Sequence, residues 1–436
     1  MSLHSHEALD RAGGFSRANL LSPLRHRDFR VMWAGMTISL MGDGIFLVAM
    51  AWQVYELSNA PSALAMVGIA MTVPHIAFLL IGGAVADRFD RRKVMLCSDA
   101  VRGLTIAAIA ALSLTGTLTI PAMIALVAVY GAGTAFFGPA FDAIVPDVLP
   151  RDLLPQANAL DQFIRPIALR LAGPAVSGVL VAAIGIGAAF AVNAASFGAS
   201  IVALLMMRTR IVRTVPEGTS TAREIAAGLR YVRSNVWLWG TFLAATFAYL
   251  VFMGPAEVLL PYVVKNDLGA SARDLGFVFA AGGVGAVGAA VLMSRQRQPR
   301  RMITFMYAVW TLATLAIVGY GLAAASWQLM LACLVFNALE TAGTIVWATL
   351  KQQHVPSHLL GRVSSLDWLI SLALLPLSFA LTAPVAAAVG AQTTLILAGV
   401  LGALLTLGPL MLPGMRDLER GGGRVGALRL ADNPQT

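Results

Sequence analysis

Residues 62–114 read SALAMVGIAMTVPHIAFLLIGGAVADRFDRRKVMLCSDAVRGLTIAAIAALSL. Two apolar stretches enclose a short charged segment, DRFDRRK at 87–93. Each stretch is about as long as the roughly 20 residues that a helix needs to cross a bilayer. Because hydrocarbon offers no partners for backbone N–H and C=O groups, a crossing segment must be helical. This part of the chain therefore predicts two transmembrane helices joined by a charged turn.

The same pattern of apolar stretch and polar break repeats along the chain. Of the 436 residues, 58% are apolar and 12% are charged, whereas soluble proteins are about a quarter charged. A transmembrane β-barrel would show segments of about 10 residues that alternate in polarity, and this sequence lacks them. We therefore expect an all-α membrane protein. Its twelve transmembrane helices are predicted at residues 29–57, 62–86, 94–114, 119–142, 154–184, 187–207, 236–263, 273–294, 302–323, 327–350, 362–389 and 392–412.

Lysine and arginine are unevenly distributed over the segments between these spans. If the N-terminus is cytoplasmic, nearly all of the 31 lie in cytoplasmic segments, and only Lys265 and Arg273 lie outside. The remaining arginines, Arg102, Arg165 and Arg170, lie within spans. Because cytoplasmic loops carry an excess of positive charge, we expect both termini in the cytoplasm. The net charge of +9 then marks topology, and no nucleic-acid partner is expected.

A long polar stretch divides the spans into two groups. We expect six-helix bundles at 29–207 and 236–413, a cytoplasmic linker at 208–235, and cytoplasmic tails at 1–28 and 414–436. Within the linker, apolar residues at helical spacing stand among arginines: Ile225, Leu229 and Val232. They predict either an amphipathic helix on the inner membrane face or a plain basic tether.

The charged turn carries a pattern of the form G-x-x-x-D-R-x-x-R-R, made by Gly83, Asp87, Arg88, Arg91 and Arg92. It resembles the signature that the major facilitator superfamily has between spans two and three, with Asp90 where that family usually has glycine. The small Gly83 is expected to let helices approach closely. Asp87 is expected to meet the positive N-terminus of a neighbouring helix.

The resemblance also suggests how this turn acts. The arginines are expected to hold the loop against anionic lipid on the cytoplasmic side. Asp142, at the inner end of span four, is expected to pair with Arg91 or Arg92 when an inner gate packs.

Further segments carry the resemblance over nearly the whole chain. They are FRVMWAGMTISLMGDGIFLVAMAW at 29–52, FFGPAFDAIVPDVLPRDLLPQANAL at 136–160, AAGLRYVR at 226–233 and LLGRVSSLDWLI at 359–370. They look like one bacterial exporter branch, similar to enterobactin exporters and macrolide efflux proteins. The branch implies two helical bundles that rock around a site near the midplane.

Span five contains RLAGPAVSGVL at 170–180, which is similar to the antiporter motif of efflux members. Its Gly173, Pro174 and Gly178 are expected to kink the helix and to permit close packing. Many drug/proton antiporters carry an arginine in span four, where this chain has Tyr130. Their usual account of proton coupling therefore does not transfer directly.

Ionisable residues deep in the spans are the main candidates for the transport site, because burying a charge in a bilayer costs at least about 2.5 kcal/mol. Asp43 lies 13 residues beyond Arg30, about 20 Å along a helix, between two glycines. It is either a protonatable carboxylate or a structural hinge. Glu340 lies at a similar depth in span ten, on one helical face with Asn337. They either line a cavity or join helices.

Further charged residues within the spans are Glu257, Arg165, Arg170 and Arg102. Glu257, near the outer end of span seven, serves either outer gating or interfacial solvation. Arg165 follows Asp161 by four residues, a spacing that allows a pair within one helix. Arg170 then needs another partner, which could be Asp43, a substrate anion or a backbone carbonyl. Arg102, three residues after Asp99, is interpreted as structural.

These observations predict a secondary transporter that exports a small, largely hydrophobic molecule by proton antiport. No nucleotide-binding G-x-x-x-x-G-K-[ST] pattern occurs, and no cofactor or metal site is expected. One alternative is an importer or facilitator of a polar metabolite, and a second is a non-transporting membrane sensor or an intramembrane enzyme. We expect a monomer in the bacterial cytoplasmic membrane, with a small-molecule substrate and membrane lipid as partners.

Overall fold

The computed structural model describes residues 21–150, 153–208, 221–296 and 298–419. The side chains of Leu80, Asp87, Pro155, 221–227 and 357–358 lie outside that description. Among the described residues, twelve helical segments are long and apolar enough to cross a membrane. The twelve predicted spans are therefore confirmed.

Six spans form the N-half. Its elements are η1 (Ser22–Arg25), α2 (Arg27–Leu57), α3 (Pro61–Arg88), α4 (Arg91–Leu114), α5 (Ile120–Val148), α6 (Leu154–Arg165), η3 (Pro166–Ala172), α7 (Gly173–Ile184) and α8 (Ile186–Met206). The fifth span is interrupted, because α6 passes into the π-helical turn η3 at Pro166 before continuing as α7. Proline lacks the N–H of a regular helical bond, and such a π-turn is a common site of helix bending.

The other six spans form the C-half, preceded by a linker helix. The elements are α9 (Thr221–Ser234), α10 (Val236–Tyr262), η4 (Val263–Asp267), α11 (Ala272–Arg295), α12 (Met302–Ala316), α13 (Val318–Leu322), α14 (Ser326–His354), α15 (Ser357–Leu372), α16 (Leu375–Val389), α17 (Ala391–Leu407) and η5 (Gly408–Met411). Of the linker residues, Val232 is buried while Leu229 is exposed, and α9 packs on α15.

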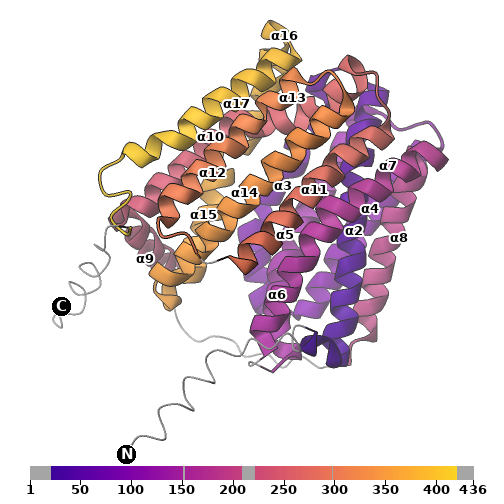
Figure 1. Ribbon diagram of the computed structural model, residues 1–436. Coiled ribbons are helices and arrows are strands. Elements are labelled where there is room, and N and C mark those ends of the chain that lie inside the picture. The colour runs from indigo at the N-terminus through magenta and orange to yellow at the C-terminus, as the bar shows by residue number, and fades with distance from the viewer. Residues whose placement is uncertain (1–20, 151–152, 209–220, 297, 420–436) are drawn as a thin grey trace, which may run out of the picture.

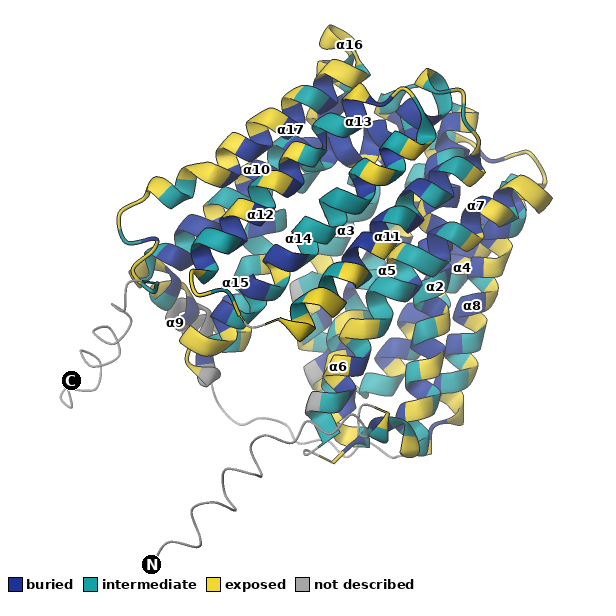
Figure 2. Cartoon of the chain, viewed as in Figure 1, coloured by how far each residue is buried: buried dark blue, intermediate teal, exposed yellow. Residues whose placement is uncertain are grey.

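The halves lie side by side as two helical bundles (Figure 1). The N-terminus of α2, the turn between α3 and α4, and the linker helix α9 all lie at one end of the molecule, which we call the basic end. The turn between α2 and α3 lies at the other end, which we call the opposite end. On the outer faces, large apolar side chains are left exposed (Figure 2), including Leu104, Leu322 and Leu404. Such faces suit lipid, which is as apolar as these side chains.

Contacts between the halves gather at the opposite end. Tyr55 Oη donates to the backbone oxygen of Val258 at 2.7 Å, and Lys265 Nζ donates to the backbone oxygen of Tyr55 at 2.6 Å. Deeper in, α7 packs against α11 through glycine. A Cβ on Gly276 would lie 2.8 Å from the Cα of Gly178. Backbone atoms cannot move aside as a flexible side chain can, so this seam depends on the missing side chains.

Candidate functional site

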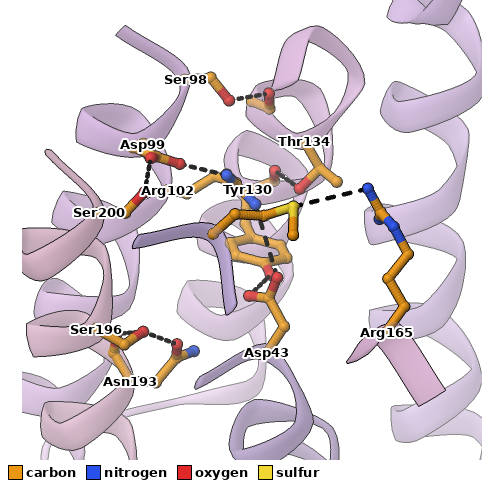
Figure 3. A network of polar contacts seen from close by, with 12 residues as sticks. Asp43, Ser98, Asp99, Arg102, Tyr130, Thr134, Arg165, Asn193, Ser196 and Ser200 are labelled. Carbon is orange, nitrogen blue, oxygen red and sulfur yellow. Dashed lines mark hydrogen bonds and ion pairs between the residues drawn. The ribbon is translucent and has the colours of Figure 1, made fainter. Parts of the chain in front are cut away.

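A cluster of ionisable side chains lies inside the N-half at mid-depth (Figure 3). Tyr130 Oη donates to Asp43 Oδ1 at 2.7 Å. Arg102 Nη1 lies 3.7 Å from Asp43 Oδ2, and the same guanidinium pairs with Asp99. Ser200 Oγ donates to the second oxygen of Asp99 at 2.7 Å. We call Asp43, Asp99, Arg102 and Tyr130 the Asp43 cluster. It joins α2, α4 and α5, with α8 behind it.

Small residues and aromatic rings hold this cluster in place. A Cβ on Gly42 would meet the side chains of Ser196 and Asn193, so the absence of a side chain at residue 42 helps α2 and α8 to pack closely. The guanidinium of Arg102 lies 4.5 Å from the ring centre of Phe137 and 4.7 Å from that of Phe197. Cation–π contact of this kind stabilises a charge that has lost its water.

The charges of the Asp43 cluster do not balance. One guanidinium faces two carboxylates, so the ionised cluster carries one excess negative charge in a place where unpaired charge is costly. The Asp99 side chain is 0% exposed and that of Arg102 is 4% exposed, whereas Asp43 keeps 17%. Asp43 is therefore the more accessible of the two carboxylates. Arg102 pairs with Asp99 three residues before it, as the spacing allows, and it also reaches Asp43, a contact that the spacing did not predict.

A second group of charges joins the two halves at mid-depth. Arg170, in η3, donates to Asn337 Oδ1 at 3.2 Å and lies 3.8 Å from Glu340 Oε2. Glu257 is exposed and close enough to Arg170 to interact electrostatically. We call Arg170, Glu257, Asn337 and Glu340 the Arg170 group. Both Arg170 and Glu257 are exposed, although they belong to membrane-spanning segments. The partner of Arg170 is thus found in α14, and it is not Asp43.

Glu340 also borders a cleft within the C-half, between α10, α12, α14 and α17. Aromatic side chains provide much of its wall, namely Tyr249, Phe252, Trp310 and Phe336. The cleft is narrow, with a volume of about 50 Å³. Asp43 does not border it. Asp43 and Glu340 therefore belong to two separate clusters.

The prediction that Gly83 lets neighbouring helices approach closely was wrong. A Cβ on Gly83 would meet no atom within 4 Å. At Gly82 it would collide with the backbone oxygen of Ala135 and lie 3.2 Å from the Cα of Phe136. Successive helical residues point about 100° apart, so the close approach of α3 and α5 depends on Gly82.

The charged part of the turn also departs from expectation. Arg91 Nη1 pairs with Asp147 Oδ2 at 2.6 Å, and Arg92 Nη2 donates to the backbone oxygen of Leu205 at 2.8 Å. The expected pairing of either arginine with Asp142 is absent from the described structure. Asp147 lies closer to the basic end of α5 than Asp142, and it is therefore the residue that the turn reaches. The side chain of Asp142 instead borders a cavity within the N-half.

Further charged residues of the turn include Asp87, Arg88 and Asp90. Arg88 ends α3 and is exposed. The side chain of Asp87 lies outside the described structure. Asp90, which replaces the usual glycine, caps α4 by accepting a hydrogen bond from the backbone N–H of Arg92 at 3.0 Å. Carboxylates are favourable at this position because they satisfy unpaired N–H groups.

The antiporter-like motif of span five packs as expected. A Cβ on Gly173 would lie 2.6 Å from the Cα of Gly44 and 2.7 Å from the backbone oxygen of Met41. The backbone oxygen of Pro174 faces Gly276 across the boundary between the halves. The motif thus fits α7 against α2 on one side and against α11 on the other.

Two further ion pairs lie in the membrane-spanning segments. Arg165 Nε donates to Asp161 Oδ2 at 2.6 Å, as the four-residue spacing predicts. Lys351, counted above among the loop residues, is instead buried, and its Nζ lies 2.6 Å from Asp367 Oδ2. The same carboxylate oxygen accepts from Trp347 Nε1 at 2.7 Å. This pair fastens α14 to α15, and spacing along the chain gave no sign of it.

Known proteins share both the sequence pattern and the fold. The multidrug efflux pump Tap of Mycolicibacterium fortuitum is 27% identical over 407 residues, covering 89% of this chain and 96% of that protein. Macrolide efflux protein A of Streptococcus pyogenes is 23% identical over 382 residues, covering 86% and 93%. Among solved structures, the nucleoside transporter NupG has a TM-score of 0.63 at 10% identity, covering 86% of this chain and 98% of that one. A bacterial homologue of the iron transporter ferroportin has a TM-score of 0.65 at 14% identity, covering 88% and 99%.

The family itself follows from a match that covers most of the chain. The family model described as transmembrane secretion effector matches residues 18–418. Together with the efflux relatives and the shared fold, this match identifies a multi-pass membrane transporter rather than an enzyme. The chain belongs to the transmembrane secretion effector family of major facilitator superfamily transporters.

Proposed function

We propose that this protein exports a small, largely hydrophobic molecule across the bacterial cytoplasmic membrane by alternating access, in exchange for protons. The names of its relatives, a multidrug efflux pump and a macrolide efflux protein, support export. The excess of lysine and arginine in the tails and turns supports a cytoplasmic basic end. We propose a monomer, since each chain contains both halves of the transport path.

The Asp43 cluster is the single observation that carries the exchange with protons. Its one excess negative charge is neutralised when Asp43 takes up a proton, and Tyr130 and Arg102 hold the ionised form when the proton leaves. Proton loss toward one side of the membrane and uptake from the other therefore changes the charge inside the N-half. That change is a sufficient reason for the halves to favour different arrangements.

The Arg170 group supplies the link between the halves. Arg170 reaches from η3 to Asn337 and Glu340 in α14, so this contact must loosen when the halves separate there. The aromatic cleft beside Glu340 must widen to admit a substrate, and a substrate bound there lies next to the same contact. Its binding can therefore compete with Arg170 for Glu340, which couples occupancy to the arrangement of the halves.

Dye transport into inverted membrane vesicles tests this proposal. Rhodamine 6G should accumulate when an inside-acid pH gradient is imposed, and a protonophore should abolish the accumulation. Asp43→Asn should lose gradient-driven accumulation but keep exchange of dye down its own gradient, because asparagine can still accept from Tyr130. Asp417→Asn, which removes an exposed carboxylate outside the spans, is the matched control. Unchanged gradient-driven accumulation in Asp43→Asn contradicts the proton site, and gradient-driven efflux contradicts export.

A further inference from the structure

Tyr55, in the last turn of α2, is bonded to the C-half through both its side chain and its backbone. Its hydroxyl donates to the backbone oxygen of Val258 in α10 at 2.7 Å. Its own backbone oxygen accepts from Lys265 Nζ in η4 at 2.6 Å. The carbonyls of a last turn have no N–H partner within their helix, and a cation is favourable beside them. We call these two hydrogen bonds the Tyr55 clasp.

The Tyr55 clasp is shielded from water. Tyr55 and Val258 are each 1% exposed. The ring of Tyr262 lies 5.8 Å from that of Tyr55, and Lys265 Nζ lies 5.6 Å from the ring centre of Trp52. Hydrogen bonds with a charged donor are about twice as strong as those between neutral groups. Both bonds must break before α2 can leave α10 at this end.

Two further contacts between the halves surround the clasp, and both are exposed to solvent. Glu56 Oε1 lies 3.1 Å from Lys265 Nζ, and the Glu56 side chain is 47% exposed. Asn59 Nδ2 donates to Asn266 Oδ1 at 2.6 Å. Exposed ion pairs contribute little to stability, because water and salt screen them. The clasp, rather than this rim, is therefore where the halves are held together at the opposite end.

The clasp acts on the helix that also carries Asp43. The helix α2 is continuous from Arg27 to Leu57. Asp43 precedes Tyr55 by twelve residues, a distance of about 18 Å along a helix. A displacement of α2 at Tyr55 is thus transmitted to the Asp43 cluster through an unbroken helix.

We propose that the Tyr55 clasp is the latch of the outer gate. Its two hydrogen bonds hold the opposite end closed, and their loss opens that end while the basic end closes. Tyr55 and Lys265 are thus positioning residues for transport, which act through the placement of α2 against α10. This inference rests on the alternating access of the proposed function, and it requires neither a particular substrate nor proton exchange.

Distances between spin labels test the latch in the purified full-length protein, without dye or gradient. The outer pair is Thr117→Cys with Thr393→Cys, two exposed positions at the opposite end of the two halves. The second pair, Phe89→Cys with Ser294→Cys, reports on the basic end. Cys97→Ser removes the exposed native thiol, whereas Cys333 is buried and stays in place.

Lys265→Met and Tyr55→Phe should each raise the ratio of long to short distances in the outer pair about tenfold. The distance in the second pair should shorten in the same molecules. Lys265→Arg keeps a charged donor and should keep the outer end closed. Glu56→Gln removes only the rim ion pair and should change the ratio less than about twofold.

Arg273→Met is the matched control, because it removes a basic side chain that lies at the opposite end over Phe277 of its own helix. It should leave both distances unchanged. Tyr55→Phe keeps the ring beside Tyr262, so it tests the clasp even where Lys265→Met fails to fold.

Three outcomes overturn the latch. They are unchanged outer distances in Tyr55→Phe, equal opening by Glu56→Gln and Lys265→Met, and an outer end that opens while the basic end keeps its distance. The last of these would make the clasp a local contact only. Because the measurement contains no dye, a failure of dye export refutes the proposed function without touching the latch, and unchanged distances refute the latch without touching export.

Discussion

Removal of the Arg102 guanidinium tests the charge balance of the Asp43 cluster directly. At 3.7 Å, and with an effective dielectric constant of about 20, the attraction between Arg102 and Asp43 is about 4 kcal/mol. Arg102 also pairs with Asp99, whose side chain is 0% exposed. Arg102→Met therefore leaves two buried carboxylates without a cation, and breaking such a pair typically costs about 3–5 kcal/mol.

The decisive variant restores the original net charge without the arginine. Asp99→Asn combined with Arg102→Met leaves Asp43 as the one carboxylate, so the cluster again carries one excess negative charge. Asparagine can still accept the hydrogen bond from Ser200. We expect the single variant to lower the melting temperature of the purified protein by about 10 °C, and the double variant to recover at least half of that loss.

The pH dependence of the melting temperature is a second test of the charge balance in the Asp43 cluster. When the pH is lowered from about 8 to about 5.5, protons can neutralise the two uncompensated carboxylates of Arg102→Met, so its melting temperature should rise relative to that of the unmodified protein. Asp417→Asn serves as the control for general surface charge. A double variant as unstable as the single one, with no gain at low pH, would refute the charge-balance reasoning.

Three further predictions concern packing and the contact between the halves. Gly82→Ala should destabilise the protein by about 1–3 kcal/mol, because the added carbon meets the backbone of α5. Gly83→Ala should change stability by less than about 0.5 kcal/mol. Thermal melting of both variants measures the difference, and equal effects would contradict the proposed packing of α3 against α5. Gly276→Ala should widen the seam between α7 and α11, seen as a longer distance between spin labels at their opposite ends. Arg170→Glu and Glu340→Arg should each lower dye export, and the exchange of both charges should restore part of it; a double variant no better than either single one would remove the ion pair from the mechanism.

The sequence predicted contacts within a helix better than contacts between helices. The pair of Asp161 and Arg165 follows from four-residue spacing, because the helix itself fixes that geometry. The contact of Arg102 with Asp43 depends on how α2 and α4 are rotated about their axes. That rotation cannot be predicted from the sequence, because the spans are apolar on nearly all of their faces. Lys351 was placed in a loop for the same reason, since its buried partner lies on another helix.

One departure from the family pattern did carry information. Tyr130 stands in span four where many antiporters have an arginine, and its hydroxyl contacts Asp43. The cation that the pattern leads one to expect is supplied by Arg102 in the preceding span. The absence of an arginine from span four, together with the presence of one in span three, thus predicts that the span-three arginine is the cation beside Asp43.

The three charged groups of the spans share one composition, in which a single arginine faces two carboxylates. They are Arg165 with Asp142 and Asp161, Arg102 with Asp43 and Asp99, and Arg170 with Glu257 and Glu340. Each group, with all its members ionised, therefore carries one excess negative charge. The arginine-rich basic end alone would repel a cation, since like charges in a low-dielectric path are costly. The negative charge of each of these three groups lowers that cost for a cation and raises it for an anion. The count of charges in each group, more than any single residue, thus favours a cation over an anion beside these spans.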